Sequence, residues 1–306
     1  MTNQLFINKK IESFDKKIFV SGDKSLSIRW VLLASQATGK SKSYNLLMSE
    51  DVVAAIEAVK KLGIKVSIRK GYCEIQGKGI NNFRYKSGLV IDSKNSGTLG
   101  RLLLGLLVKS PVKIKIIGDK SLSKRDFSRV TLPLEKFGAK FFYKLKNKLP
   151  LSILGSKSLK GINYIENKGS AQCKSSVMLA ALNASGTTSI KAKKSRDHTE
   201  LLFKYLRIPI KVKKTKKFDF IYIKKPKKIN AFNYQIPGDI SSSAFFMVLT
   251  TLADNSKLLI KNVNINPSRI GVITILKKMG AHVTLKNQKN YRGEKISDIL
   301  IKSSKK

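Results

Sequence analysis

The segment SEDVVAAIEAVKKLGIKVSI (residues 49–68) predicts an amphipathic helix followed by a strand. The residues of its apolar face are Val52, Ile56 and Val59, with Ala55 beside them. Ser49 or Asp51 can accept hydrogen bonds from the free backbone N–H groups of the first turn. Gly63 is the residue type that commonly ends a helix, so IKVSI after it reads as the strand.

The same pattern returns three times along the chain. The later copies are RVTLPLEKFGAKFFY (129–143), DHTELLFKYLRIPIKV (197–212) and GVITILKKMGAHVTL (271–285). The positions that end the four helices are Gly63, Gly138, Ile208 and Gly280, at intervals of 75, 70 and 72 residues. This period exceeds that of small solenoid repeats and suits an α/β unit with two helices and several strands.

Each repeat also contains an earlier apolar helix. These helices are predicted at SIRWVLLASQA (27–37), NSGTLGRLLLGLLVKS (95–110), SSVMLAALNAS (175–185) and SSSAFFMVLTTLADN (241–255). A strand is expected at SYNLL (43–47), after the first of them. The chain is therefore predicted to be an α/β protein of four βαβαββ-like units.

A short phrase marks several junctions between strand and helix. GDKSLS occurs at 22–27 and 118–123, and a looser form, GDISSS, occurs at 238–243. Small residues at a helix start direct backbone N–H groups and hydroxyls at one point, where the helix dipole favours an anion. A lysine within the phrase adds a full positive charge. These segments are predicted to be anion-binding helix starts.

Three residues near the first helix start suit a phosphate or carboxylate. Lys24 and Ser25 are neighbours at the turn, and Arg29 follows one helical turn later. A plain capping turn needs the serine but neither cation. ATGKS (37–41) is not the end of a nucleotide-binding P-loop, because Ala34 stands where the first glycine belongs and the stretch ends a helix.

Two further segments carry candidate ligand contacts. In NSGTLGR, Gly97 lets a ligand approach the backbone, whereas Arg101 reads as structural because it lies a turn into the helix. In GDKSLSKRDFSRV, Arg125 is the candidate ligand clamp. Lys124 and Arg129 read as solvated.

The third early helix and the late helix after it also begin with polar residues. Ser170, Gln172 and Lys174 in GSAQCKSS suit hydroxyl groups and a phosphate, and Cys173 reads as a packing residue. In KSRDHTE, Ser195 can reach a ligand. A local capping network explains the rest of this turn equally well, through Arg196, Asp197 and His198.

Composition limits the class of protein. The 306 residues suffice for two domains, and no run of apolar residues is long enough to span a membrane. The N-terminus lacks an apolar leader, which predicts a mature, cytoplasmic chain. Cys73 and Cys173 form no CxxC pair, and the histidines are His198 and His282, so neither a disulfide framework nor a metal site is expected.

The formal net charge of +42 attracts anions, of which nucleic acid is the obvious polymer. The lysines are nevertheless spread over the whole chain, and the densest run (211–228) reads as a strand pair with charged outer faces. No nucleic-acid-binding signature accompanies them. A basic binding protein without catalytic activity remains only an alternative.

Six motifs together resemble the family of 3-phosphoshikimate 1-carboxyvinyltransferase, or EPSP synthase, from about residue 18 to the end. They are SGDKSLSIR, NSGTLGRLLLGLL, GDKSLSKRDFSRV, GSAQCKSS, SRDHTE and IPGDISSSAFFMV followed by NPSRIGVITILKKMGA. The resemblance implies two domains of three βαβαββ units each (inverse α/β barrel-like), which close over the substrates. The chain would then cross between domains near 18–24 and 233–240. Residues 22–236 would form the complete domain, and 1–21 with 237–306 the incomplete one.

The reaction implied by this resemblance joins the 5-hydroxyl of shikimate 3-phosphate to C2 of phosphoenolpyruvate and then eliminates phosphate. The family needs no metal or organic cofactor and is usually monomeric. The residues that match its substrate-binding positions are Lys24, Ser25, Arg29, Gly97, Arg125, Ser170, Ala171, Gln172 and Ser195. By the same resemblance Gly97 and Arg125 would hold phosphoenolpyruvate, Lys24 would touch both substrates, and the others would hold shikimate 3-phosphate.

The sequence departs from the family pattern at several points. Ile28 replaces the usual histidine, and Ser96 occupies the second position of its motif. By this resemblance the sequence is expected to contain four of the family's six units and to lack the segment with the general base, so no catalytic residue is assigned. The incomplete domain is expected to expose an apolar face. A fragment, a frameshifted product and one part of a split enzyme with a complementing chain remain open.

The sister transferase that acts on UDP-N-acetylglucosamine shares the fold. The GDKS, SAQ-K-S and SRDHT motifs favour the shikimate enzyme over it.

Overall fold

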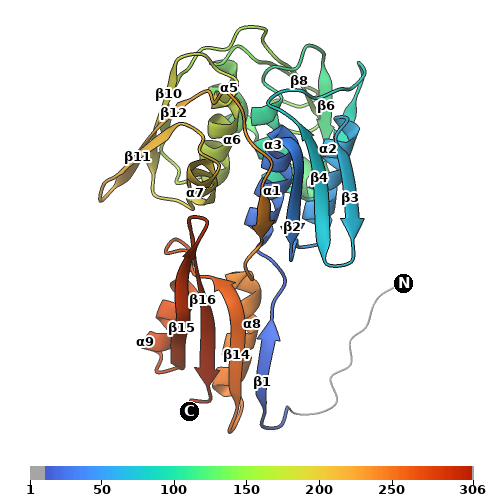
Figure 1. Ribbon diagram of the computed structural model, residues 1–306. Coiled ribbons are helices and arrows are strands. Elements are labelled where there is room, and N and C mark those ends of the chain that lie inside the picture. Colours follow the sequence, from blue (N-terminus) through green and yellow to red (C-terminus); the bar gives the residue numbers. More distant parts are fainter. Residues whose placement is uncertain (1–10, 305–306) are drawn as a thin grey trace. The chain divides into compact units, whose positions relative to one another are not determined.

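The computed structural model describes residues 11–304 (Figure 1). The chain divides into two compact lobes. The large lobe comprises residues 22–236, and the small lobe comprises 1–21 and 237–306. Among the described helices none is long and apolar enough to cross a membrane.

The large lobe contains three four-stranded sheets of the same topology. In each sheet an edge strand runs parallel to the second strand, and the remaining pairs are antiparallel. The first sheet is β13 (Asn233–Gln235), β2 (Thr38–Tyr44), β4 (Tyr72–Lys78) and β3 (Lys65–Arg69). The second is β5 (Val90–Asp92), β6 (Ile114–Ile117), β8 (Leu151–Leu154) and β7 (Lys140–Tyr143). The third is β9 (Asn163–Glu166), β10 (Thr187–Lys193), β12 (Phe218–Lys224) and β11 (Ile210–Lys214).

Three early helices lie in the interior of the large lobe (Figure 1): α1 (Lys24–Gln36), α3 (Gly97–Leu106) and α6 (Ala171–Ala181). Most of their residues are buried. A Cβ atom on Gly105 of α3 would lie 2.2 Å from the carbonyl oxygen of Ser176 on α6, so the glycine permits this close approach. The late helices are α2 (Glu50–Lys61), α4 (Lys120–Ser123) with α5 (Ser128–Glu135), and α7 (His198–Tyr205).

The helix ends predicted at Gly63, Gly138 and Gly280 are confirmed, whereas the left-handed residue after α7 is Arg207, one position before the predicted Ile208. Gly63, Gly138 and Gly280 have φ angles of 82°, 96° and 83°, and Arg207 takes the same left-handed conformation with φ 56°. The predicted apolar face of α2 is buried as expected. Ser49 occupies the N-cap position of α2, but its side chain makes no capping hydrogen bond.

The strand expected at 43–47 is wrong, because β2 spans Thr38–Tyr44. Its inward residues are the small, polar Ser41 and Ser43, whereas Lys40 and Lys42 face outward toward Glu74. An apolar alternation pattern cannot find such a strand. The position of β2 after α1 supports the rejection of a P-loop at 37–41, and β11 and β12 confirm the strand pair predicted in 211–228.

The small lobe contains one sheet of the same topology and two helices. The sheet is β1 (Asp15–Phe19), β14 (Lys257–Asn264), β16 (Glu294–Lys302) and β15 (His282–Tyr291), and the helices are α8 (Ile240–Leu252) and α9 (Gly271–Lys278). The core lies between α8, α9 and the sheet, and includes Met247, Ile260 and Ile299.

At each of the two points where the chain passes between the lobes, an edge strand pairs with a strand that is distant in sequence. β1 comes just before α1 in sequence, yet it pairs in parallel with β14 of the small lobe. β13 comes just before α8, yet it pairs in parallel with β2 of the large lobe. Each lobe therefore completes one sheet with a strand that is distant in sequence.

The expected apolar face of the small lobe is present on α8. Phe245 is 79% exposed and Leu252 is 63% exposed, and the side chains of Val248 and Leu249 lie at the surface as well. Met247, by contrast, points into the core. One side of α8 thus covers the sheet, and the opposite side is an uncovered apolar surface.

Candidate functional site

The repeated GDxSxS phrase forms helix starts capped by its aspartate. The Oδ1 atoms accept from backbone N–H groups at 2.9 Å (Asp23 from Leu26), 2.6 Å (Asp119 from Leu122) and 2.7 Å (Asp239 from Ser241). Aspartate is a favoured N-cap residue, so this signal was present in the sequence. The aspartate of this phrase therefore serves as a helix N-cap, and whether such a helix start can bind an anion depends on the cations next to it.

Arg29 is the centre of a buried polar network at the start of α1. Its side chain is 4% exposed and donates from Nε to Oγ1 of Thr199 (2.8 Å) and from Nη2 to Oγ of Ser175 (3.1 Å). Nη1 donates to the carbonyl oxygen of Ser25 (3.0 Å). Oγ of Ser175 and Oγ1 of Thr199 are 2.7 Å apart. One guanidinium group thus joins α1, α6 and α7.

Ser25 and Ser195 lie at the same end of these helices. Oγ of Ser25 accepts a hydrogen bond from Nη1 of Arg196 (3.3 Å). Oγ of Ser195 is buried and has no hydrogen-bond partner among the described residues. Lys24 is half exposed, and its Nζ is 3.4 Å from Oδ2 of Asp51. We call the set Lys24, Ser25, Arg29 and Ser195 the α1 cluster.

The capping network considered for 196–198 is only partly present. Asp197 occupies the N-cap position of α7, but its side chain makes no capping bond. Its carboxylate instead accepts from Nζ of Lys214 (2.7 Å), which raises the pKa of that lysine. His198 is fully buried.

A second cluster surrounds the start of α3. A Cβ atom on Gly97 would lie 2.9 Å from Nη1 of Arg101 and 3.0 Å from Nη1 of Arg125, so both guanidinium groups lie over this glycine. Nη2 of Arg125 donates to Oδ1 of Asn95 (3.3 Å). The absence of a side chain at Gly97 leaves the space that the two arginines occupy.

Gln172 on α6 belongs to this second cluster. Its Oε1 accepts from Nη1 of Arg101 (2.6 Å), and its Nε2 donates to Oγ1 of Thr98 (2.9 Å). The amide orientation is thereby fixed from two sides. We call Gly97, Arg101, Arg125 and Gln172 the α3 cluster.

Arg101 has a larger part in this cluster than the sequence indicated. Its guanidinium lies 5.2 Å from the centre of the Phe127 ring, and it orients Gln172. Burial lowers the pKa of Arg101 below its ordinary value, and the nearby Arg125 and Arg129 act in the same direction. Arg101 follows Gly97 by one helical turn, and this spacing in the sequence indicates that both residues lie on one face of α3.

The start of α6 carries the remaining candidates. Ser170 is the N-cap residue, and its Oγ accepts from the backbone N–H of Cys173 (3.3 Å). Ala171 is buried. Cys173 is also buried, and burial raises the pKa of its thiol, as suits a packing residue.

The structure corrects the reading of Lys174. Its side chain is 0% exposed, and its Nζ lies 2.5 Å from Oε1 of Glu200 on α7. It is therefore one half of a buried ion pair and is not available at the surface as a ligand contact. This partner could not be predicted from the sequence, because Glu200 lies 26 positions away on another helix.

The two clusters adjoin each other through α6. Gln172 belongs to the α3 cluster and Ser175 contacts Arg29, and these residues lie three positions apart, on one face of the helix. The starts of α1, α3, α6 and α7 thus present arginines, hydroxyls and an amide together. Such donors suit a ligand that carries phosphate and carboxylate groups.

Comparison with known proteins identifies the family. The family model for EPSP synthase (3-phosphoshikimate 1-carboxyvinyltransferase) matches residues 8–303. The chain belongs to the EPSP synthase family. The 3-phosphoshikimate 1-carboxyvinyltransferase of Thermoanaerobacter sp. (strain X514) is 40% identical over 289 residues, which are 94% of this chain and 67% of that protein. The enzyme of that name from Bacillus subtilis (strain 168) is 37% identical over 297 residues, 96% of this chain and 68% of that protein.

A solved structure gives the same result for the fold. The EPSP synthase from Acinetobacter baumannii has a TM-score of 0.87 and 36% identity, and the match covers 96% of this chain and 65% of that one. The α/β architecture of βαβαββ units is therefore that of the EPSP synthase family. The chain spans about two thirds of the length of these relatives.

Proposed function

We propose that this member of the EPSP synthase family binds shikimate 3-phosphate through the α1 cluster and the start of α6. Arg29, Ser25 and Ser195 would hold its phosphate and carboxylate, and Ser170, Ala171 and Gln172 would line its ring. The observation that carries the proposal is the Arg29 network, because its contacts to Ser175 and Thr199 fix a cation at the starts of these helices. The buried hydroxyl of Ser195, just before α7, has no hydrogen-bond partner among the described residues. A cation held in place before the ligand arrives needs little reorganisation to bind it.

The α3 cluster would receive phosphoenolpyruvate. Arg125 and the backbone at Gly97 would hold its anionic groups, Gln172 would lie beside it, and Lys24 would reach both substrates. Arg101 would act indirectly, since its hydrogen bond to Gln172 positions that amide. Both substrates carry two anionic groups, which explains the need for cations from several helices.

The reaction that these sites serve would be that named for the relatives. The 5-hydroxyl oxygen of shikimate 3-phosphate would bond to C2 of phosphoenolpyruvate while C3 gains a proton. Loss of that proton and of inorganic phosphate would then give the enolpyruvyl ether. The part of the chain described here contributes the electrostatic stabilisation of this scheme, and no residue in it is assigned to the proton transfers.

The test is phosphate release by the purified chain with both substrates, together with calorimetric binding of shikimate 3-phosphate alone. We expect binding of shikimate 3-phosphate and a loss of affinity of about tenfold or more in Arg29→Lys, which keeps the charge but loses the forked contacts. UDP-N-acetylglucosamine serves as the competing acceptor. Raised thermal stability with that sugar nucleotide, and none with shikimate 3-phosphate, would contradict the proposal.

A further inference from the structure

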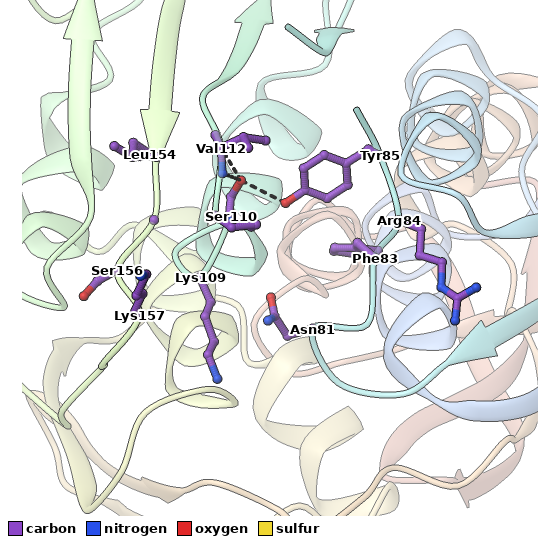
Figure 2. A pocket seen from close by; sticks show the side chains of 12 residues that line it. Asn81, Phe83, Arg84, Tyr85, Lys109, Ser110, Val112, Leu154, Ser156 and Lys157 are labelled. Atoms are coloured by element: carbon purple, nitrogen blue, oxygen red, sulfur yellow. Dashed lines mark hydrogen bonds between the residues drawn. The ribbon is translucent and has the colours of Figure 1, made fainter. Parts of the chain in front are cut away.

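A cavity of about 780 Å³ opens in the large lobe at the far end of α3 from Gly97. Its walls come from residues 81 and 83–85 after β4, residues 109–112 after α3, and residues 154–157 at the end of β8 and beyond it (Figure 2). Since a ten-residue helix is about 15 Å long, this cavity is separate from the α3 cluster. None of the residues assigned to substrates lines it.

One wall of this cavity is apolar and aromatic. Phe83 and Tyr85 line it, together with Val112 and Leu154 (Figure 2). The Tyr85 hydroxyl donates to Oγ of Ser110 (2.8 Å), which in turn donates to the carbonyl oxygen of Val112 (2.6 Å). Because the polar end of Tyr85 is satisfied and held, its ring is a fixed surface.

A second cavity, of about 260 Å³, shares Asn81 and Lys109 with the first. It lies where the C-terminal ends of the three interior helices meet, because Thr38, Lys109 and Asn183 follow α1, α3 and α6. The segment 225–228 closes it with three more lysines. The two cavities are therefore neighbours with a common cationic boundary.

Five lysines line the two cavities: Lys109, Lys157, Lys225, Lys227 and Lys228. No acidic residue lines either cavity, and within residues 11–304 none of the five ammonium groups has a hydrogen bond or an ion pair. Arg84 also borders the first cavity, but its side chain extends away from Lys109 in Figure 2. Such crowding of like charges favours an anionic occupant.

Helix dipoles offer a simpler explanation, since cations are favourable at helix C-termini. Among residues 11–304, however, none of the five lysines donates to a carbonyl of these helices, and one carbonyl in the last turn of each helix already accepts a backbone hydrogen bond. Ala34 accepts from Ala37 (3.2 Å), Leu104 from Leu107 (3.2 Å) and Ala180 from Asn183 (3.0 Å). The lysines are thus not used to cap the helices.

Asn183 supplies an independent observation. It lines the second cavity and is 6% exposed, and in the described part of the chain its Nδ2 has no hydrogen-bond partner. A buried amide donor without an acceptor is unfavourable. A ligand rich in oxygen acceptors at this position would satisfy it.

We propose that the two cavities form a binding site for an aromatic phosphate compound of the nucleotide type. Its ring would lie against Phe83 and Tyr85 in the first cavity. Its phosphates would lie in the second cavity, where Lys109 and the lysines of 225–228 surround them and Asn183 donates to them. The volume of the first cavity, about 780 Å³, is within the range of about 300–1,000 Å³ typical of sites for such molecules, and the smaller second cavity would hold only the phosphates. The proposal does not depend on the assignment of the substrate clusters.

The test is titration calorimetry of the full chain with adenosine 5′-diphosphate, with adenosine and inorganic pyrophosphate as partial ligands. The diphosphate is expected to bind more tightly than either part. The triple variant K225S/K227S/K228S and the single variant Lys109→Ser should each lose about tenfold or more in affinity. Phe83→Ala should weaken binding of adenosine 5′-diphosphate and leave pyrophosphate unaffected.

A matched control removes the same charge elsewhere on the large lobe. The triple variant K213S/K216S/K217S changes exposed lysines of the β11–β12 hairpin and should leave affinity within about twofold, as expected of a distant charge screened by salt. Equal losses in both triple variants would show attraction to the overall positive charge and overturn the proposal. So would displacement of the nucleotide by shikimate 3-phosphate, an unchanged affinity in Phe83→Ala, or no binding at all.

Discussion

The interior helices of the large lobe and helix α8 of the small lobe are equivalent elements with different surroundings. In α1, α3 and α6 nearly all apolar side chains are buried. In α8, which is at least as apolar, Phe245 and Leu252 are mostly exposed. The same βαβαββ repeat therefore forms the same local structure in both lobes, but one repeat alone covers only one side of its early helix.

The difference between the lobes has an energetic consequence. Full burial of a large apolar side chain contributes about 1.5–3 kcal/mol relative to exposure. The large lobe gains this contribution on all sides of its three helices, whereas the small lobe does not gain it on the outer face of α8.

The largest expected effect concerns the buried ion pair between α6 and α7. Lys174→Ala should destabilise the large lobe by about 3–5 kcal/mol, because it leaves the Glu200 carboxylate buried without its partner. Denaturant unfolding measures the loss. The double variant K174M/E200L removes both charges and should recover most of the stability. A single variant as stable as the wild type would show that the pair is solvated.

A matched pair of substitutions tests the comparison of α3 with α8 directly. Leu103→Ala in α3 should cost about 2–5 kcal/mol, since it opens a cavity in a closed core. Phe245→Ala in α8 should change stability by no more than about 0.5 kcal/mol, because the ring is exposed. Urea unfolding monitored separately in each lobe provides the values. A cost for Phe245→Ala as large as that for Leu103→Ala would mean that α8 is covered.

The stability of the small lobe should also depend on pH, through the carboxylate of Asp298. Burial alone would raise its pKa, but hydrogen bonds from Lys261, the Asn262 N–H and Asn287 outweigh this and lower it. The carboxylate therefore stabilises the lobe above the unfolded pKa of about 3.9, and this stability is lost as the pH falls below that value.

Asp298→Asn checks this pH dependence. At neutral pH the variant should be less stable by about 1–3 kcal/mol, since a buried charged hydrogen bond is lost. The difference from the wild type should shrink as the pH falls through the acid range in thermal melts. A constant difference at all pH values would assign the effect to packing.

The smallest effect on stability is expected at Gly97, where binding should change instead. In Gly97→Ala the new methyl group would come within 3.0 Å of the Arg101 and Arg125 guanidinium groups, which are flexible ends that can move. Folding should be unaffected, and affinity for phosphoenolpyruvate should fall by about tenfold, measured with shikimate 3-phosphate present. Unchanged affinity would remove Gly97 from the proposed site.

Local features of the fold could be predicted from the sequence. The helix ends at Gly63, Gly138 and Gly280 depend on a residue's own conformational range, and the apolar faces depend on spacing within one helix. β2 could not be predicted, because its buried residues are small serines instead of apolar side chains.

Contacts between residues that are far apart in sequence could not be predicted from the sequence pattern. β1 pairs with β14 through residues 242 positions apart, and Arg29 meets Ser175 and Thr199 at separations of 146 and 170. Motif resemblance supplied the candidate site residues, but the buried ion pair of Lys174 and the hydrogen bond from Arg101 to Gln172 became visible only in the packed helices. Local propensity carries no information about such partners.

Hydrogen–deuterium exchange of the full chain, with and without shikimate 3-phosphate, tests most directly whether the large lobe binds this ligand by itself. We predict slower exchange at the starts of α1, α6 and α7 when the ligand is present, and unchanged exchange in α8. No protection at the three helix starts, or protection confined to α8 and the small lobe, would contradict the assignment of the site.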